Sequence, residues 1–289
     1  MENSMYEQTY RSHQVPRYEK PRRRHTGRII ALVILLICLL SIGLYTGYHL
    51  LFPTAIRTTK EIRTFNLSAG TQPTLIVTDN DGFVHVHPGN GNTVTVATTK
   101  VGDSFGASPD DFKVSYSQSG NTITIQVTNS SIHLLDFSQT SQADLDITLP
   151  ARSDLRIQTD SGNITATSIQ GKMNLTSDSG SMQIADASLK SSSTLSTNSG
   201  NITMTGSIDT TGRYMFQSDS GDIDIALPRG TSFHVNLNSD SGTITNDFQV
   251  VPAKQSLPST RTVVGDVGSA PQATVAIQSN SGSLRLRQI

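Results

Sequence analysis

Residues 155–184 read LRIQTDSGNITATSIQGKMNLTSDSGSMQI and contain two copies of one pattern. In each copy apolar and polar residues alternate, the tripeptide Asp-Ser-Gly interrupts them, and the alternation resumes. A period of two residues is typical of a β-strand with one buried face. Asx and Gly favour a bend, because the Asx side chain can bond its own backbone and glycine can adopt a positive φ. Each copy therefore predicts two short strands joined by a corner.

The tripeptide Asx-Ser-Gly recurs six times between residues 160 and 282. Successive glycines are 18, 20, 21, 21 and 40 residues apart, so we interpret the last interval as two periods. Weaker copies surround Gly82 and Gly120, which extends the repeat over nearly the whole chain after residue 72. The predicted corner residues are Asp160, Gly162, Asp178, Gly180, Asn198, Gly200, Asp219, Gly221, Asp240, Gly242, Asn280 and Gly282.

One repeat has a single apolar face and cannot bury it alone. Stacking equivalent units at the strand spacing of about 4.8 Å would produce a continuous core. We therefore predict an all-β fold, a stacked β-solenoid resembling a β-helix with repeats of about 20 residues, over residues 73–289. The spacing also permits an alternative in which each tripeptide closes an antiparallel hairpin.

The N-terminal region predicts a membrane anchor. No charged side chain occurs from Ile29 to Phe52, a run of 24 residues. Seven Lys/Arg and three Asp/Glu residues precede this run, and such a positive excess keeps a flank in the cytoplasm. We expect a disordered basic cytoplasmic tail over 1–28, one transmembrane helix over 29–52 in the lipid bilayer, and a linker with the first strand over 53–72. Residues 73–289 would then be extracytoplasmic. A cleavable signal peptide is the alternative, but no small-residue cleavage site follows the run.

Charge and composition exclude several classes of function. After residue 52 the chain carries 15 Lys/Arg and 20 Asp/Glu residues, and this acidity argues against nucleic-acid binding. The single cysteine, Cys38, excludes an internal disulfide. His85 and His87 would share one face of a strand, but no third metal ligand is evident. His133 and His234 lie in no recognisable catalytic context. We therefore expect no enzyme activity, no cofactor and no metal site.

The predicted corner acids raise one further possibility. Stacked in chain order, Asp160, Asp178, Asn198, Asp219 and Asp240 would repel one another unless they are solvated or neutralised. Calcium is one answer, and capping of each turn in full solvent is the other. We favour capping, because the nine-residue glycine-rich repeat of calcium-binding β-rolls is absent.

The serial units x-[ST]-[DN]-S-G-x-[ILM]-x-[ILM], together with the closing segment VVGDVGSAPQATVAIQSNSGSLRLRQI at 263–289, resemble the bacterial putative-adhesin family of β-strand-repeat proteins, also called the toastrack domain. The resemblance covers about residues 60 to 289. It implies a stacked β array, tethered to a membrane and associated with adhesion or envelope-stress sensing. It implies no catalytic residue.

These observations together predict a non-enzymatic scaffold at the cell envelope that mediates adhesion or protein interaction. Its expected partner is an envelope protein or a surface polymer. The alternative is a component of envelope-stress signalling that acts through an inner-membrane partner. The irregular segments 101–112, 129–142 and 250–260 are the expected contact surface, because loops that leave a repeat scaffold commonly carry specificity.

Overall fold

The computed structural model describes residues 26–51, 56–102, 108–129, 142–252 and 261–289. The chain divides into two units, Met1–Thr54 and Ala55–Ile289. The first unit contributes one helix, and the second contains all of the described strands.

Helix α1 extends over Thr26–Leu51, close to the predicted segment 29–52. Leucine and isoleucine dominate it, and leucine loses little side-chain freedom in a helix. Its large apolar side chains described between residues 30 and 43 are all exposed, with Leu32 at 64%. Within the described residues, no helix meets the length and apolarity needed to cross a membrane.

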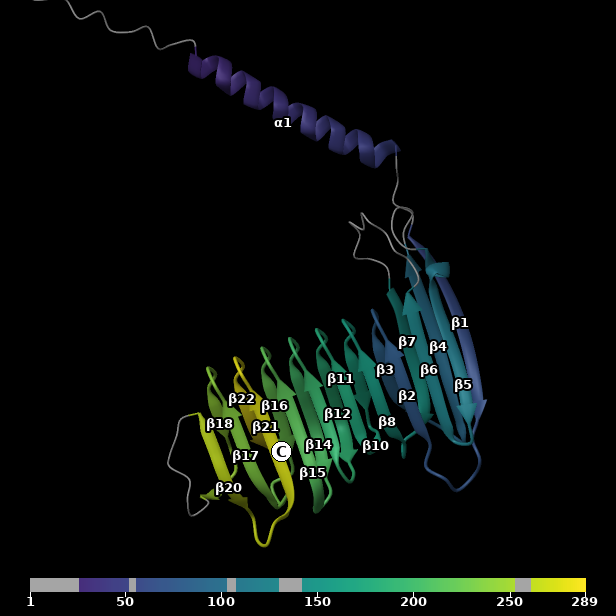
Figure 1. Cartoon of the computed structure of the whole chain (residues 1–289), viewed down its shortest axis with the longest axis vertical. Coiled ribbons are helices and arrows are strands. Elements are labelled where there is room, and N and C mark those ends of the chain that lie inside the picture. The colour runs from purple at the N-terminus through teal and green to yellow at the C-terminus, as the bar shows by residue number, and fades with distance from the viewer. Residues whose placement is uncertain (1–25, 52–55, 103–107, 130–141, 253–260) are drawn as a thin grey trace, which may run out of the picture. The chain divides into compact units, whose positions relative to one another are not determined.

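The second unit consists of two β-sheets (Figure 1). Sheet A has the order β1-β4-β7-β3-β9-β12-β14-β16-β22-β18, and β10 also pairs with β12. Its strands are β1 (Arg57–Asn66), β3 (Val84–Gly89), β4 (Thr93–Gly102), β7 (Gln142–Pro150), β9 (Ile164–Thr167), β10 (Gln170–Gly171), β12 (Met182–Leu189), β14 (Ile202–Ile208), β16 (Ile223–Leu227), β18 (Ile244–Asn246) and β22 (Leu284–Gln288).

Sheet B has the order β19-β20-β17-β21-β15-β13-β11-β8-β2-β6-β5. Its strands are β2 (Thr74–Asp79), β5 (Phe112–Ser119), β6 (Thr122–Asn129), β8 (Asp154–Thr159), β11 (Met173–Ser177), β13 (Ser193–Thr197), β15 (Thr211–Ser218), β17 (Phe233–Ser239), β19 (Val250–Pro252), β20 (Thr262–Val267) and β21 (Gln272–Ser279). A short 3₁₀ helix, η1 (Pro109–Asp111), precedes β5.

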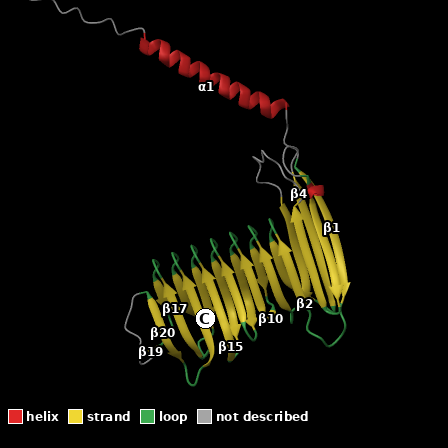
Figure 2. Ribbon diagram, in the orientation of Figure 1, coloured by secondary structure: helices red, strands yellow, loops and turns green. Residues whose placement is uncertain are grey.

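The repeating element is a rung, which we define as a strand of sheet B, a corner, and the following strand of sheet A. The strand before each Asx-Ser-Gly corner lies in sheet B and the strand after it lies in sheet A (Figure 2). Equivalent strands of neighbouring rungs pair in parallel, as in β8 with β11 and β9 with β12. The predicted stacked all-β repeat is therefore confirmed at these six corners, and the hairpin alternative is wrong there.

The rungs do not stack in chain order, which corrects the simple predicted solenoid. The final rung, β21–β22, lies between the rungs β15–β16 and β17–β18. The 40-residue interval before Gly282 therefore holds no intermediate rung, and its interpretation as two periods was wrong. Residues of this interval form β19 and β20 instead, and β20 pairs antiparallel with the outer side of β17. Similarly, the first rung, β2–β3, has the later strands β6 and β7 on one side and β8 and β9 on the other.

Antiparallel strands occupy both ends of the stack. At one end β4 pairs antiparallel with β7 and with the outermost strand β1. The weak repeat copy around Gly120 lies here, and it is the turn of the antiparallel hairpin β5–β6 rather than a corner. Gly120 has a φ of +60°, a conformation that glycine adopts without steric cost. The second weak copy, around Gly82, does form a corner between β2 and β3.

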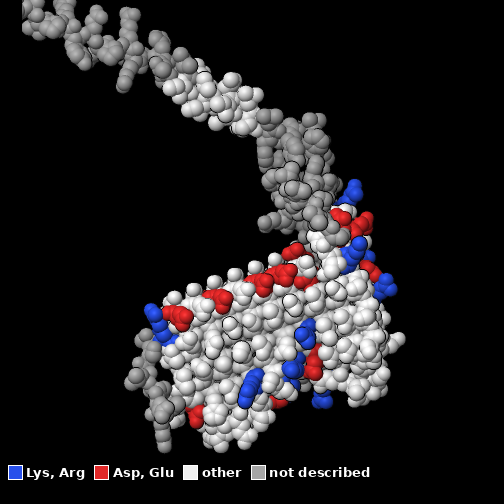
Figure 3. Space-filling view, in the orientation of Figure 1, with Lys and Arg blue, Asp and Glu red and all other residues white. Residues whose placement is uncertain are grey.

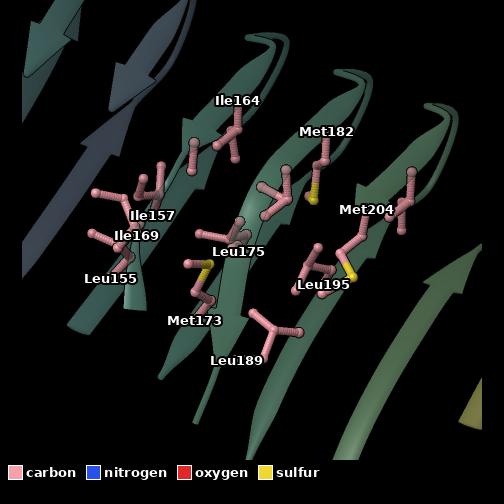
Figure 4. Packing of buried hydrophobic residues seen from close by; sticks show 14 of the residues in the cluster. Leu155, Ile157, Ile164, Ile169, Met173, Leu175, Met182, Leu189, Leu195 and Met204 are labelled. Carbon is pink, nitrogen blue, oxygen red and sulfur yellow. The ribbon is translucent and has the colours of Figure 1, made fainter. Parts of the chain in front are cut away.

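The apolar core lies between the two sheets (Figure 4). Alternating strand residues point inward, so the register places like side chains above one another in adjacent rungs. Fully burying an aliphatic side chain of this size is worth roughly 1.5–3 kcal/mol. One such row in sheet B runs Ile157, Leu175, Leu195, Phe216, Ile277 and Leu237, all buried.

Candidate functional site

The corners of successive rungs form one continuous line, which we call the corner column. Its glycines, in spatial order, are Gly82, Gly162, Gly180, Gly200, Gly221, Gly282 and Gly242. A Cβ atom on Gly162 would lie 2.0 Å from the carbonyl oxygen of Gly82, and one on Gly221 would lie 1.8 Å from that of Gly200. The six predicted corner glycines are absent from the residues with positive φ, so that expectation was wrong. Glycine is needed because adjacent backbones approach too closely for a side chain.

A buried hydroxyl group holds each of the six predicted corners. Ser218 Oγ accepts a hydrogen bond of 2.8 Å from the Gly221 amide and donates one of 2.9 Å to the Gly200 carbonyl. A hydroxyl suits this position because it can donate and accept at once. The equivalent hydroxyls belong to Ser177, Thr197, Ser239 and Ser279, which make both bonds, and to Thr159, which accepts from Gly162.

These hydroxyls are structural residues that the sequence reasoning missed. The available signal was the Ser or Thr that precedes every Asx-Ser-Gly tripeptide. All six side chains are buried, whereas the neighbouring Asx residues are exposed. The bond to the turn therefore comes from the residue before the Asx, and the predicted capping by the Asx itself was wrong.

The Asx side chains instead form the outer surface of the corner column. In spatial order they are Asp160, Asp178, Asn198, Asp219, Asn280 and Asp240. Asn198 Nδ2 donates to Asp178 Oδ1 at 3.5 Å, and Asn280 Nδ2 donates to Asp219 Oδ1 at 3.4 Å. Acidic residues line this edge of the domain in Figure 3. The inserted final rung thus places an amide between Asp219 and Asp240, which the chain order had placed side by side.

The residue after each glycine forms a second set of bonds between rungs. Asn163 Oδ1 accepts from the Ser181 amide at 2.8 Å, and Asn201 Oδ1 accepts from the Asp222 amide at 2.9 Å. Asp144 on β7 plays the same part for the first rung, accepting from the Phe83 amide at 3.0 Å. Two sets of side chains therefore connect neighbouring corners: the buried hydroxyls before the Asx residues, and the amide or carboxylate side chains on the outside of the turn.

His85 and His87 lie on one face of β3, as predicted, and meet an acid from the neighbouring strand β7. His87 Nε2 lies 2.8 Å from Asp146 Oδ1 and 3.2 Å from Thr148 Oγ1, and His85 Nδ1 lies 3.9 Å from the same Asp146 oxygen. Because one imidazole nitrogen contacts both Thr148 and Asp146, these side chains do not form a nucleophile relay, which uses both nitrogens. Among the residues with described positions, no group of three or more His, Cys, Asp or Glu is suited to hold a metal ion.

The surface hollows near the ends of the domain are polar. One of about 500 Å³ is lined by Arg229, Ser232, Asp247, Phe248 and Gln288, together with neighbouring loop residues. The Ser232 hydroxyl there donates to the backbone carbonyls of Val267 and Ser269 rather than to a general base. This hollow therefore presents hydrogen-bonding groups without an activated nucleophile.

The first corner departs from the other six. Asp79 takes the place of the hydroxyl residue, since it is in register with Thr159 of the next rung. The residue is 1% exposed, and neither carboxyl oxygen has a hydrogen-bond partner in the part of the chain that the structure describes. Burial raises the pKa of the Asp79 carboxyl to about 7, and the negative charges of Asp81 and Asp144 add to this effect. The amides of Asn80 and Asp81 lower it in part, although neither lies in hydrogen-bonding geometry.

Residues 66–211 match the model of the Toastrack DUF4097 family. The chain belongs to the Toastrack family. The resemblance inferred from the repeated x-[ST]-[DN]-S-G units is thus confirmed. The match includes the Toastrack corners at Gly82, Gly162, Gly180 and Gly200, whereas the closing segment 263–289 lies beyond it.

Two solved structures align with this chain over most of its length. A putative cell adhesion protein from Clostridium sporogenes aligns with a TM-score of 0.51 and 10% identity, over 81% of this chain and 100% of that one. A putative adhesin from Bacteroides fragilis aligns over 79% of this chain and 97% of its own, with a TM-score of 0.36 and 12% identity. Among curated proteins, none matches this sequence. The likeness to the Clostridium protein is one of fold.

Proposed function

We propose that this Toastrack protein is a non-enzymatic binding scaffold, with its β domain outside the cell and residues 29–52 as its membrane anchor. The observation that carries the binding role is that the domain's own side chains fill the space between its two sheets. Aliphatic and aromatic side chains fill the space between the sheets, and the corner hydroxyls bond to adjacent corners. The outer sheet faces and the connecting segments are then the surfaces available to a partner.

The membrane part of the proposal rests on the sequence and on the side chains of α1. The run from Ile29 to Phe52 has no charged residue and follows a basic segment. The exposed apolar side chains of α1, such as Leu36 at 59%, would be covered by lipid. The positive charge before the run supports a cytoplasmic N-terminus.

Cysteine accessibility tests this topology, because Cys38 is the only cysteine. In a Cys38→Ala background, single cysteines replace Ser4 in the tail or exposed Ser269 in the β domain. In intact cells, an impermeant maleimide is expected to label the Ser269 position and to reach the Ser4 position only after lysis. Equal labelling of both positions in intact cells, or release of the protein by carbonate washing, would contradict the anchor.

Photo-cross-linking in intact cells tests the binding role. The reactive group is placed at Met215, exposed on β15 of sheet B, at Gln183 on β12 of sheet A, and at Gln255 in the predicted contact segment 250–260. The proposal expects an adhesion partner or surface polymer to be captured from one of these positions. Reproducible capture of an inner-membrane protein would favour the signalling alternative. Absence of any adduct at normal protein levels would argue against a binding scaffold.

Adhesion is favoured over signalling as the biological role by one further point. The structural neighbour from Clostridium sporogenes is named as a putative cell adhesion protein, and its whole length aligns with this chain.

Polymer degradation by the purified full chain would overturn the non-enzymatic part of the proposal. The control is the same preparation after heat unfolding.

A further inference from the structure

The first corner, residues 79–82, lacks the group that joins the other corners. At those corners a serine or threonine hydroxyl is buried beside the glycine, and at five of the six it donates to the carbonyl of the adjacent rung. At the first corner the equivalent position is Asp79. A carboxylate can only accept hydrogen bonds, whereas a carboxylic acid can also donate one.

The carbonyl that the first corner faces belongs to Ala143 on β7. A Cβ atom on Gly82 would lie 2.3 Å from the Ala143 oxygen and 3.2 Å from Asp79 Oδ2, so the two oxygens flank the same point. At the other corners, the carbonyl of the adjacent glycine takes the place of the Ala143 carbonyl, and a hydroxyl that donates to it takes the place of Asp79 Oδ2. Two oxygens without a proton between them would repel each other in a buried site.

The charges around Asp79 also disfavour its ionised form. Among the described residues, the charged groups that act on it are Asp81 of the same turn and Asp144 of β7, and both are acidic. On the other side, the next rung presents the hydroxyl of Thr159 to the corner column and leaves Asp160 exposed. Both oxygens are buried and unpartnered, and no described residue places a compensating cation beside a negative charge on Asp79.

We propose that the first corner is a proton-binding site, in which neutral Asp79 replaces the corner hydroxyl and donates to the Ala143 carbonyl. The bound proton joins the first rung, β2–β3, to the strand β7 that stacks on it. Loss of the proton places a charge in the corner and weakens this junction. The end of the domain that contains β4 to β7 is then held less tightly to the central rungs at alkaline than at acid pH.

The raised pKa of Asp79 supports the direction of the effect. A carboxyl whose pKa is higher in the folded than in the unfolded state binds more protons when folded, so stability falls as pH rises between the two pKa values. The folded value of about 7 and the usual value near 3.8 place this fall between about pH 4 and pH 7. Most of the loss is complete at about pH 8.

Thermal unfolding of the full chain in mild detergent tests the proposal. Far-ultraviolet circular dichroism is the suitable probe, because the chain has no tryptophan. Between about pH 5 and pH 8 the midpoint of the wild type is expected to fall by about 5–10 °C more than that of Asp79→Ser, which restores the corner hydroxyl. Asp160→Asn, at the neighbouring corner, serves as the control and keeps the wild-type dependence. Subtracting the Asp79→Ser curve removes the contribution of the histidines.

Hydrogen exchange locates the effect. At about pH 8, the amides of β7 and β2 are expected to exchange faster in the wild type than in Asp79→Ser, whereas those of β14 exchange equally.

If Asp79→Ser fails to fold, Asp79→Asn provides a neutral side chain that can donate a hydrogen bond at every pH, and this variant must also remove the pH dependence of the unfolding midpoint. The proposal is overturned if these variants keep the wild-type pH dependence. It is also overturned if calcium restores the wild type at pH 8 but leaves Asp79→Ser unchanged, since a cation would then fill the corner.

Discussion

The central rungs and the end strands of the β domain are built in different ways. In the central rungs, β8 to β16 with β21 and β22, neighbouring strands run parallel and side chains alternate between buried and partly exposed. At the end of sheet A, β1 pairs antiparallel with β4 and is exposed over most of its length. Ile62 in β1 is 70% exposed, whereas Leu195 in β13 is fully buried.

This difference shows which strands extend the stack and which strands end it. A parallel rung presents the same corner glycine and hydroxyl to the next rung, so further copies can be added. An antiparallel strand presents neither. The edge strand β1 also carries Arg57, Lys60, Glu61 and Arg63, and charges on an edge strand disfavour pairing with other chains. The repeated sequence therefore builds the uniform part, and non-repeated sequence ends it.

A methyl group in the corner column is expected to have the largest effect. In Gly200→Ala, the new Cβ would lie 2.0 Å from the Gly180 carbonyl oxygen, and a backbone atom cannot move away cheaply. We expect destabilisation of about 3 kcal/mol or more, or failure to fold, in urea denaturation of the full chain. Gly230→Ala is the control, because nothing lies within 4 Å of its Cβ position. Equal stability of the two variants would contradict the close approach of the rungs.

Truncating an apolar side chain should destabilise a central rung much more than the edge strand β1. Leu195→Ala removes a fully buried side chain between two rungs and is expected to cost about 2–5 kcal/mol. Ile62→Ala in the edge strand should change the free energy of unfolding by about 0.5 kcal/mol or less. Urea denaturation followed by circular dichroism measures both. A similar loss in the two variants would mean that β1 is covered in solution.

Removing a corner hydroxyl should have an intermediate effect. Ser218→Ala leaves the Gly221 amide and the Gly200 carbonyl without their buried partner, at a cost of about 1–3 kcal/mol. Ser218→Thr should be tolerated, since Thr197 makes the same two bonds. The matched change in the end hairpin is Ser115→Ala, whose exposed hydroxyl makes one long bond of 3.4 Å. Its effect is expected to be negligible, and a loss as large as that of Ser218→Ala would refute the distinction.

Charge on the outer surface of the corner column should have the smallest effect. Asn280→Asp places three acids in succession, because residue 280 lies between Asp219 and Asp240. We expect a loss of about 0.2–1 kcal/mol that decreases as salt is added. Asn280→Ala removes the amide without adding charge and should show no such salt dependence. If the loss of stability in Asn280→Asp did not depend on salt, residue 280 would not lie between Asp219 and Asp240.

Much of the corner could be predicted from the sequence, and some of it was misinterpreted. The alternation correctly identified inward residues such as Ile157, Ile164 and Leu175, because strand geometry alone decides which side chains share a face. The role of glycine was misassigned, since a close approach between backbones leaves no local signal distinct from a positive φ. Asp79 was overlooked because the corner around Gly82 lacks the Asx-Ser-Gly tripeptide. The contact of Asp146 with His87 joins strands that are far apart in the chain.

The sequence by itself determined the all-β class, the two strands and corner of each repeat, and the faces that are buried. These follow from local periodicity and turn chemistry, which act over a few residues. Only the tertiary structure decided the order of the rungs, the insertion of β21–β22 before the rung β17–β18, and the antiparallel ends. Backbone hydrogen bonds between parallel strands are the same for every pair of similar rungs, so the neighbours of each rung are selected by the packing of the whole domain.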